Sequence, residues 1–363
     1  MAEQQHTAQG SGAAGASRGA ARVWTIRDML SWCEGYLAKH GDPDPRGSAR
    51  WLVEHATGLE KVELYLNMDR ALEAAELDFL RDAVRRRAAG EPLQYLTGTA
   101  PFRFISVAVR PGVLIPRPET EVLVSALLEL LPRAPRRIAT DSHSEEEIAR
   151  LLAAKAPAAD ADEASEDADT ADRAALGQRA GESQAPVEPC RLQVLEVGTG
   201  SGCIACSIAF ERPDADVTAT DISPVAVALA RENAQRVGVA DRVSVIECDL
   251  DEGLVPESRG TFDALISNPP YIPTAVYDGL DPQVHDYEPQ LALDGGTDGL
   301  DFFRRLLPAA HADLKPRGVL AVELHEDCLD VAAELARHAG FTDVRIIADL
   351  NGKPRVLTAH APA

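Results

Sequence analysis

One short run, Asn268-Pro269-Pro270-Tyr271, contains residues that could bind a planar amino group. Neither proline has a backbone N–H and each fixes its own φ, so the run ends an apolar strand predicted over residues 262–266 and forms a stiff loop. An NH2 group could donate to the Asn268 side-chain oxygen and to the Pro269 carbonyl, while Tyr271 stacks on its π-system. An isolated Pro-Pro pair more often merely ends a strand beside a core tyrosine, so the interpretation depends on the neighbouring elements.

A glycine-rich turn, Gly198-Thr199-Gly200-Ser201-Gly202, follows a second predicted strand that ends in Glu196-Val197. Glycines between a strand and a helix allow the backbone to approach a nucleotide cofactor closely. A dinucleotide fingerprint requires G-x-G-x-x-G, but position 203 is Cys and the third glycine is at 202. The spacing therefore favours S-adenosylmethionine, although a glycine loop by itself is a weak signal.

Two acidic residues follow the next two predicted strands. Asp221 lies 19 residues after Gly202, where a carboxylate could accept hydrogen bonds from both ribose hydroxyls. The alternative is that Asp221 only caps the helix that begins at Pro224. Asp249 follows the third strand and could reach an adenine amino group, with Leu250 beside the ring. All of these candidates fall at carboxyl ends of strands, where open α/β sheets bind ligands.

These motifs require a parallel sheet to hold them. Short apolar runs alternate with helical patterns, which predicts an α/β, Rossmann-like seven-stranded domain over residues 191–363. A polar segment over residues 272–290 is predicted to cover the site, and residues 349–352 form a hairpin turn between the last two strands. The predicted strands span residues 192–197, 217–219, 243–247, 262–266, 318–324, 344–348 and 354–359.

The first part of the chain has a different pattern. Residues 23–90 repeat apolar positions at helical spacing, which predicts a small helical domain for packing or partner recognition. Its last helix ends in Arg85-Arg86-Arg87, which we interpret as a solvated helix end. Residues 91–131 are predicted to be a linker, in which Phe102 to Val109 alternate like a strand and Arg110-Pro111-Gly112 marks the turn of a hairpin. A helix is predicted from Glu119 to about Leu131.

Two segments have too little apolar surface to offset the entropy of ordering. Residues 1–22 are rich in Ala, Gly, Ser and Gln and are predicted to be a disordered tail. Residues 132–190 contain no aromatic residue and are predicted to be a disordered acidic insertion with no catalytic role.

Charge and composition restrict the function. The net charge is −22, and residues 191–363 carry 14 basic against 28 acidic side chains. Nucleic-acid binding depends on Lys and Arg at the phosphates, so no direct nucleic-acid contact is expected. No apolar run approaches membrane-spanning length. Cys203 and Cys206 lack a second ligand pair, so they predict a helix core rather than a metal site, and a reducing cytoplasm is expected.

The chain resembles the HemK-type (PrmC) glutamine N5-methyltransferases, which act on peptide chain release factors. The resemblance runs from about residue 24 to 359 and is interrupted by the acidic insertion, which the usual family pattern lacks. It is carried by Glu91-Pro92-Leu93-Gln94-Tyr95 with Gly98 and Phe102, residues 114–121, 196–202 and 268–271, Tyr287-Glu288-Pro289 with Ala292-Leu293, residues 296–300, and Asp349-Leu350-Asn351-Gly352 through Arg355.

The resemblance implies a helical amino-terminal domain beside a methyltransferase sheet. It implies methyl transfer from S-adenosylmethionine to the glutamine amide of a Gly-Gly-Gln motif in a release factor. We expect the enzyme to be a cytoplasmic monomer that needs no metal. The implied catalytic residues are Asn268, Pro269 and Tyr271, and Pro270 joins them in binding the substrate. The implied cofactor-binding residues are Glu196, Gly198, Thr199, Gly200, Ser201, Gly202, Asp221, Asp249, Leu250 and Asn268.

Three other functions are compatible with parts of the pattern. An adenine-specific DNA or RNA methyltransferase shares the Asn-Pro-Pro-Tyr loop but would need a basic groove and a base-flipping domain. A sister enzyme that methylates a ribosomal-protein glutamine is poorly separated by sequence. A catalytically idle cofactor-binding module is disfavoured because both the glycine loop and the amide-binding loop are complete.

Overall fold

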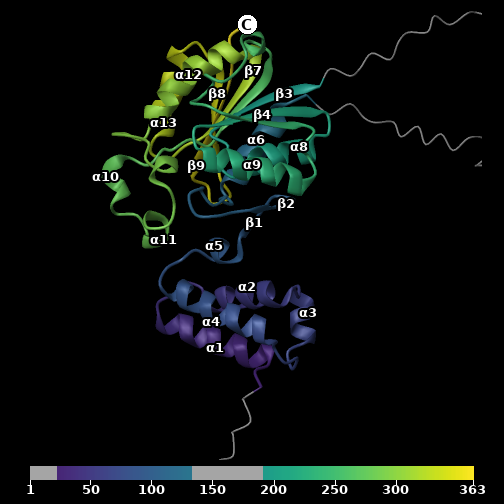
Figure 1. Ribbon diagram of the computed structural model, residues 1–363. Coiled ribbons are helices and arrows are strands. Elements are labelled where there is room, and N and C mark those ends of the chain that lie inside the picture. The colour runs from purple at the N-terminus through teal and green to yellow at the C-terminus, as the bar shows by residue number, and fades with distance from the viewer. Residues whose placement is uncertain (1–22, 133–190) are drawn as a thin grey trace, which may run out of the picture.

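The computed structural model describes residues 23–132 and 191–363 (Figure 1). The predictions of disorder for residues 1–22 and 133–190 lie outside this part of the chain. The described residues form a helical bundle at the amino-terminal end, a linker, and a seven-stranded sheet covered by helices on both faces (Figure 1). This is the Rossmann-like architecture, with a small helical domain, that the sequence predicts.

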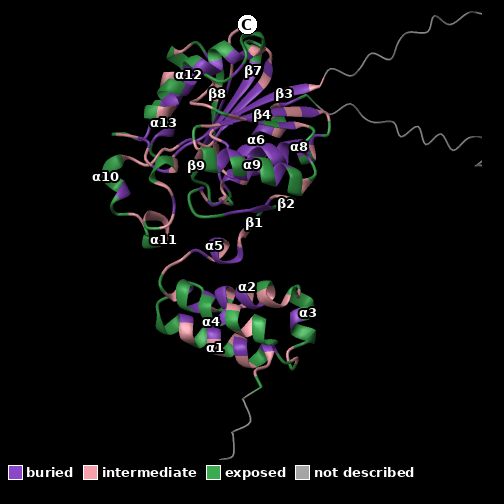
Figure 2. Ribbon diagram, in the orientation of Figure 1, coloured by how far each residue is buried: buried purple, intermediate pink, exposed green. Residues whose placement is uncertain are grey.

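The helical bundle is built from amphipathic helices with strong end signals. Thr25 and Asp28 form a capping box at the start of the first helix, and Gly58 ends the second in a left-handed conformation. The buried side chains, among them Met29, Leu52 and Leu80, form one core. Figure 2 shows buried and exposed residues alternating along these helices, as amphipathic helices require. The helices are α1 (Ile26–Lys39), α2 (Pro45–Thr57), α3 (Lys61–Leu66) and α4 (Ala74–Ala88).

The basic end of α4 differs from the prediction at one position. Arg85 and Arg86 lie at the surface and pair with neighbouring carboxylates. Arg87 is buried instead, with its Nε 2.6 Å from Asp42 and its Nη1 2.7 Å from the side-chain oxygen of Gln283. The triplet is therefore only partly a solvated helix end, because its last residue connects the helical bundle to the sheet domain.

The linker contains a helix and a strand that sequence reasoning missed. The hairpin turns at Arg103 and Phe104 rather than after Val109, and Arg103 has a φ of 50°. Its guanidinium contacts Glu211 and the Glu121 carbonyl, contacts that stabilise a left-handed turn without glycine. The elements are α5 (Leu93–Thr97), β1 (Thr99–Phe102), β2 (Ile105–Ala108) and α6 (Thr120–Leu130).

The sheet has the strand order β5-β4-β3-β6-β7-β9-β8. Strands β3 to β7 pair in parallel, and β9 runs antiparallel between β7 and β8. The order reverses between β3 and β6, a switch point at which open α/β sheets bind ligands. The strands are β3 (Leu192–Val197), β4 (Ala215–Asp221), β5 (Val243–Glu247), β6 (Phe262–Ser267), β7 (Leu314–Glu323), β8 (Thr342–Ala348) and β9 (Pro354–His360).

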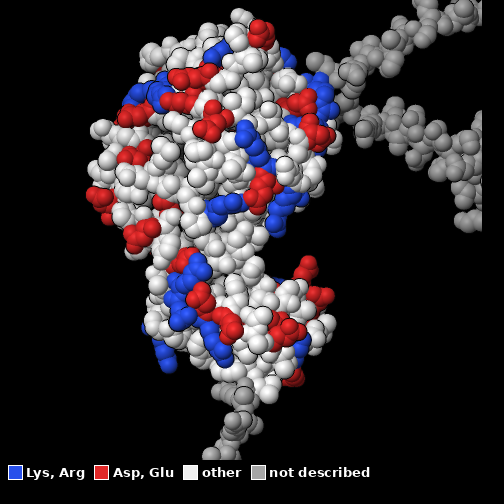
Figure 3. Space-filling model, viewed as in Figure 1, with Lys and Arg blue, Asp and Glu red and all other residues white. Residues whose placement is uncertain are grey.

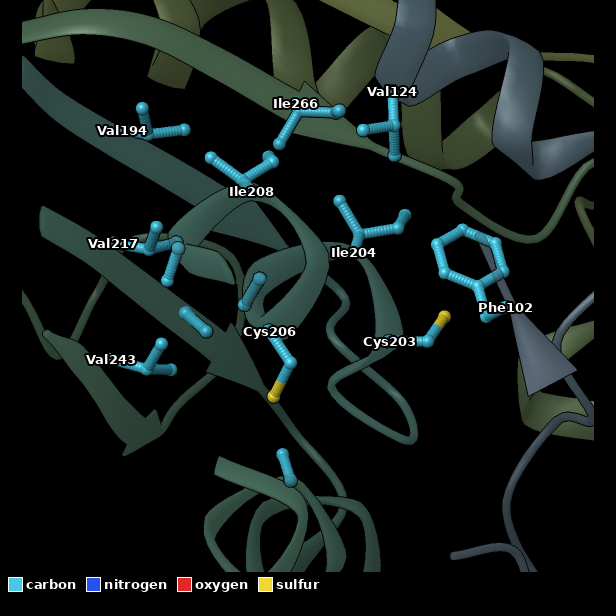
Figure 4. Packing of buried hydrophobic residues seen from close by; sticks show 14 of the residues in the cluster. Phe102, Val124, Val194, Cys203, Ile204, Cys206, Ile208, Val217, Val243 and Ile266 are labelled. Carbon is cyan, nitrogen blue, oxygen red and sulfur yellow. The ribbon is translucent and has the colours of Figure 1, made fainter. Parts of the chain in front are cut away.

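Each face of the sheet has its own apolar core, because successive strand residues point to opposite faces. Val194 packs with helices α6, α8 and α9 on one face (Figure 4), whereas Leu195 packs with α12 and α13 on the other. Cys203 and Cys206 are free thiols inside the first core, as predicted. The remaining elements are α8 (Cys203–Glu211), α9 (Pro224–Val237), η1 (Pro256–Ser258), α10 (Thr274–Tyr277), α11 (Pro282–His285), η2 (Gln290–Ala292), α12 (Asp301–Asp313) and α13 (Leu329–His338).

Candidate active site

A cavity of about 710 Å3 opens at the carboxyl edge of the sheet. Its size and its mixture of apolar and polar walls are typical of sites for small molecules and cofactors. Most residues that the sequence predicted for the site meet here. Those that line it are Gly198, Thr199, Gly200, Ser201, Asp221, Asp249, Leu250, Asn268 and Pro270.

The glycine loop bends sharply between β3 and α8. Gly198, Gly200 and Gly202 all have positive φ, a conformation in which other residues are strained. A Cβ atom on Gly202 would lie 2.9 Å from the Cα atom of Ala230 in α9, so the third glycine serves helix packing. It does not line the cavity, whereas the first two glycines do.

Glu196 lies beneath this loop, outside the lining of the cavity, and is fully buried. Its Oε2 accepts hydrogen bonds from the Thr199 hydroxyl at 2.7 Å and the Ala205 N–H at 3.1 Å, whereas its Oε1 has no partner among the described residues. Burial raises the pKa of Glu196 to about 8. Glu196 therefore holds the shape of the glycine loop from behind.

Asp221 lies at the end of β4 and faces the cavity. Its two carboxyl oxygens accept the N–H groups of Gly200 and Ser223, at 2.8 and 2.9 Å, and burial raises its pKa. The side-chain cap of α9 comes from Ser223, so Asp221 is not merely that helix's cap. Each oxygen keeps a further lone pair for a ligand hydroxyl.

Asp249 and Leu250, which follow β5, also line the cavity. Arg305 of α12 donates to the Asp249 carboxylate at 2.7 Å. Leu250 has a φ of 49°, and its carbonyl accepts from the Thr220 hydroxyl at 2.7 Å. These contacts fix an acidic and an apolar side chain beside the glycine loop.

The Asn-Pro-Pro-Tyr loop continues from β6. The Nδ2 of Asn268 donates to Thr120 Oγ1 at 3.1 Å, which leaves the side-chain oxygen of Asn268 available to a ligand. Tyr271 lies behind the cavity lining, where its hydroxyl donates to Glu323 Oε1 at 3.3 Å. Pro269 likewise does not line the cavity through its side chain.

Sequence reasoning assigned no role to several side chains at the site. Thr120, Arg117 and Arg305 line the cavity, and Arg117 pairs with the buried carboxylate of Glu288. Glu288 also accepts the Ile115 N–H at 3.2 Å, so the linker is fastened to the segment over residues 272–290. For Arg117, Thr120 and Glu288 the available signal was that they fall within stretches shared with the resembled family, whereas Arg305 lies outside those stretches.

The segment over residues 272–290 was predicted to cover the site. Thr274 at its start and Pro289 and Gln290 near its end line the cavity. Tyr287 donates to the Ala89 carbonyl at 3.3 Å, so the same segment contacts the end of α4. It therefore lies between the cavity and the helical bundle.

The donor and acceptor set fits S-adenosylmethionine. Glycines with positive φ bring the backbone to the cavity wall, and the Asp221 carboxylate stands where ribose hydroxyls can donate. Leu250 is an apolar residue in the cavity lining, where an adenine ring could pack. Among the described residues, no group of three or more His, Cys, Asp or Glu is arranged to hold a metal ion.

Residues 28–98 match the family model described as PrmC N-terminal domain, and residues 184–278 match the methyltransferase small domain. A release factor glutamine methyltransferase of Geobacter sulfurreducens is 39% identical, over 92% of this chain and 96% of that protein. Counterparts from Moorella thermoacetica and Chlorobaculum tepidum are 36% and 35% identical, over 93% and 94% of this chain and 98% of each protein. A methyltransferase structure from Pyrococcus furiosus is 25% identical, covers 48% of this chain and 78% of its own, and has a TM-score of 0.36.

Proposed function

The chain belongs to the release factor glutamine methyltransferase family, and we propose that it methylates the glutamine amide of the Gly-Gly-Gln motif in peptide chain release factors. It is an S-adenosylmethionine-dependent methyltransferase. The observation that carries the proposal is that the glycine loop, Asp221 and the Asn-Pro-Pro-Tyr loop open into one cavity. A cofactor and an amide acceptor can therefore meet there.

The reaction needs an amide nitrogen to act as a nucleophile, although its lone pair is delocalised into the carbonyl. In the proposed site the Asn268 side-chain oxygen and the Pro269 carbonyl accept the two amide hydrogens. These acceptors raise electron density on nitrogen and orient its remaining lone pair toward the cofactor side. S-adenosylmethionine, when bound, supplies a methyl group on a positively charged sulfur.

The other site residues are proposed to bind the cofactor and to hold the amide-binding loop in place. The backbone of Gly198 to Ser201 and the Asp221 carboxylate hold the cofactor, with Asp249 and Leu250 at its adenine. Glu196 and Gly202 support this loop from behind the cavity wall. Pro270 keeps the amide-binding loop stiff, and Tyr271 contributes its ring, anchored through the hydroxyl to Glu323.

The release factor is the proposed macromolecular partner, and the enzyme is proposed to act as a cytoplasmic monomer. Five described cysteines are free thiols, which supports a reducing compartment. No helix in residues 23–132 or 191–363 is long and apolar enough to cross a membrane. On the face shown in Figure 3, Lys and Arg side chains are interspersed with Asp and Glu.

The direct test is to incubate the purified enzyme and a release factor with methyl-labelled S-adenosylmethionine and to locate the label by mass spectrometry. We expect one methyl group on the Gly-Gly-Gln glutamine. A release factor with asparagine at that position is one methylene shorter and should not be labelled. Label on a ribosomal-protein glutamine but not on the release factor, or on adenine in nucleic acid, would contradict the proposal.

A further inference from the structure

Asn233 is a polar side chain inside α9 that has no role in the chemistry described above. It is 0% exposed and does not line the cavity. Burying an amide is unfavourable unless its polar atoms find partners. An asparagine side chain has an oxygen that accepts and two hydrogens that can be donated. The structure gives a partner to the oxygen and to both hydrogens of Asn233.

Two of these hydrogen bonds go to the linker. The side-chain oxygen of Asn233 accepts the Ala108 N–H at 2.7 Å, and its Nδ2 donates to the Ala108 carbonyl at 2.9 Å. Ala108 is the last residue of β2, and the next residue, Val109, donates to Gly98 on the β1 side. Because backbone groups alternate in direction along a strand, those of Ala108 point away from β1. Asn233 therefore takes the place of a neighbouring strand at this edge of the hairpin.

The third hydrogen bond goes to the glycine loop. Nδ2 of Asn233 also donates to the Ser201 carbonyl at 2.8 Å. The first bond of α8 runs from the Cys206 N–H to the Gly202 carbonyl, so the Ser201 carbonyl lies just before the helix. Ser201 is 3% exposed and lines the cavity. One side chain thus joins the linker hairpin to the loop that is expected to hold the cofactor.

The chain that continues from β2 forms part of the cavity wall. Residues 112–117 line the cavity, and Val113 belongs to a small buried core between the linker and α9. The Val113 carbonyl accepts from the Tyr95 hydroxyl at 2.7 Å. A Cβ atom on Gly200 would lie 3.9 Å from Val113 Cγ1, so this stretch lies against the glycine loop. Asn233 therefore connects two stretches of wall close to the point where they meet.

We propose that Asn233 is a positioning residue for S-adenosylmethionine, because it holds the glycine loop and residues 112–117 in the arrangement that binds the cofactor. Without its side chain, three buried backbone groups would lose their partner, and the two stretches should separate more often. A cofactor that binds only the joined arrangement then binds more weakly, in proportion to the fraction of molecules that adopt it. This inference rests on the proposed function and extends it to a residue outside the cavity lining.

The first test is Asn233→Ala, with S-adenosylmethionine binding measured by calorimetry in the absence of a release factor. We expect Kd to rise roughly 10- to 100-fold, because unpaired buried groups favour the separated arrangement. In methylation assays, KM for S-adenosylmethionine should rise with Kd. The kcat at saturating cofactor should be nearly unchanged, since bound cofactor restores the joined arrangement.

Val227→Ala is the matched control for a general loss of stability. Val227 is also buried in α9, at 2% exposed, but it belongs to the core on the sheet and does not line the cavity. The truncation should lower Tm and leave Kd for S-adenosylmethionine near the wild-type value. Asn233→Asp serves if Asn233→Ala does not fold. Its carboxylate can accept from Ala108 but cannot donate to either carbonyl, so Kd should rise here too.

Hydrogen exchange of the cofactor-free protein tests the cause of the change in Kd. In Asn233→Ala, amides of residues 109–117 and of the glycine loop should exchange faster than in wild type or Val227→Ala, and S-adenosylmethionine should restore their protection. An unchanged Kd in the Asn233 variants, or an equal rise of Kd in Val227→Ala, would overturn the inference. Failure of the proposed function looks different, because the wild-type protein would then bind S-adenosylmethionine but label no release factor glutamine.

Discussion

At the residue scale, Asn268 uses the two ends of one amide for two purposes. Its nitrogen is held by Thr120, and its oxygen is left for the ligand. Asn268→Ala removes both, so methyl transfer should fall roughly a hundred- to a thousandfold, the usual effect of losing one preorganised polar group. Cofactor affinity, measured by calorimetry, should change little.

Asn268→Asp separates these two purposes. The carboxylate can still accept from the substrate, but it cannot donate to Thr120 and it adds a charge. We expect it to be as slow as Asn268→Ala in the same labelling assay. Methylation at the wild-type rate in either variant would show that Asn268 takes no part in methyl transfer.

The buried carboxyl group of Glu196 should make the stability of the protein depend on pH. Its pKa is raised to about 8 in the folded protein, whereas an unfolded glutamate titrates near about 4.3. The folded state therefore retains a proton that the unfolded chain releases, so this contribution to stability is complete below about pH 4.3 and is lost as pH rises through about 8. Glu196→Gln should flatten the decline of Tm between about pH 5 and 8, measured by calorimetry without cofactor.

Other buried carboxyls, such as Asp313, also have raised pKa values and remain in the variant. The difference between the wild-type and Glu196→Gln curves therefore isolates Glu196. Parallel curves would show that Glu196 ionises in the folded protein near the pH of an unfolded glutamate.

At the element scale, the glycine loop determines how closely α8 approaches α9. Gly202→Ala should destabilise the protein, because the new Cβ would lie 2.9 Å from Ala230 and the φ is +77°. Gly238 is the matched control, since its φ is +78° but nothing lies within 4 Å of a new Cβ. Gly238→Ala should cost only the left-handed strain, about 1–2 kcal/mol.

Urea unfolding measures the loss of stability in each of the two variants. Gly202→Ala should lose clearly more stability than Gly238→Ala and should also bind S-adenosylmethionine more weakly, since the loop must move. Equal losses in the two variants would show that α8 and α9 can separate at no cost.

At the scale of the whole molecule, Arg87 connects the helical bundle to the segment beside the cavity. Its side chain is 7% exposed and that of Asp42 is 2% exposed, so removing one partner leaves a buried charge. Arg87→Ala should destabilise the protein by about 3–5 kcal/mol. It should also raise KM for the release factor, because Gln283 loses its partner.

Arg85→Ala is the control for this substitution. Arg85 belongs to the same helix end, but its pair with Asp82 is exposed and contributes little. Thermal melts and steady-state kinetics of both variants should be compared. Both substitutions change the helix propensity of α4, but only Arg87→Ala removes the contact between the domains. An Arg87→Ala protein as stable as Arg85→Ala would exclude that connection.

The acidic stretch proposed as an insertion joins the described chain far from the cavity. The described chain stops at Pro132 after α6 and resumes at Arg191, next to Leu192 at the amino end of β3, whereas the cavity lies at the carboxyl ends. Replacing residues 136–188 by a short Gly/Ser linker should therefore leave kcat and Tm nearly unchanged. A large loss of either would show that the segment contributes to the folded enzyme.

Local signals in the sequence determined most of the architecture and the composition of the site. Strand periodicity, prolines that end β6, and glycines at left-handed positions act over a few residues, so they can be read without a fold. The strands and the two loops of the site follow from them. The segment from Thr99 to Phe102 was missed because it is short, contains Pro101 and turns at Arg103, which only distant carboxyl and carbonyl groups hold in place.

Only the tertiary structure decided which side chains hold the site together. Thr120 and Asn268 are 148 residues apart in sequence, Arg87 and Gln283 are 196 apart, and neither pair has a local pattern. Their contacts exist because sheet order and domain packing bring separate elements to one edge. Residue types along the chain state which groups can donate or accept, but the fold alone determines which groups meet, and hence which end of the Asn268 amide is held by Thr120.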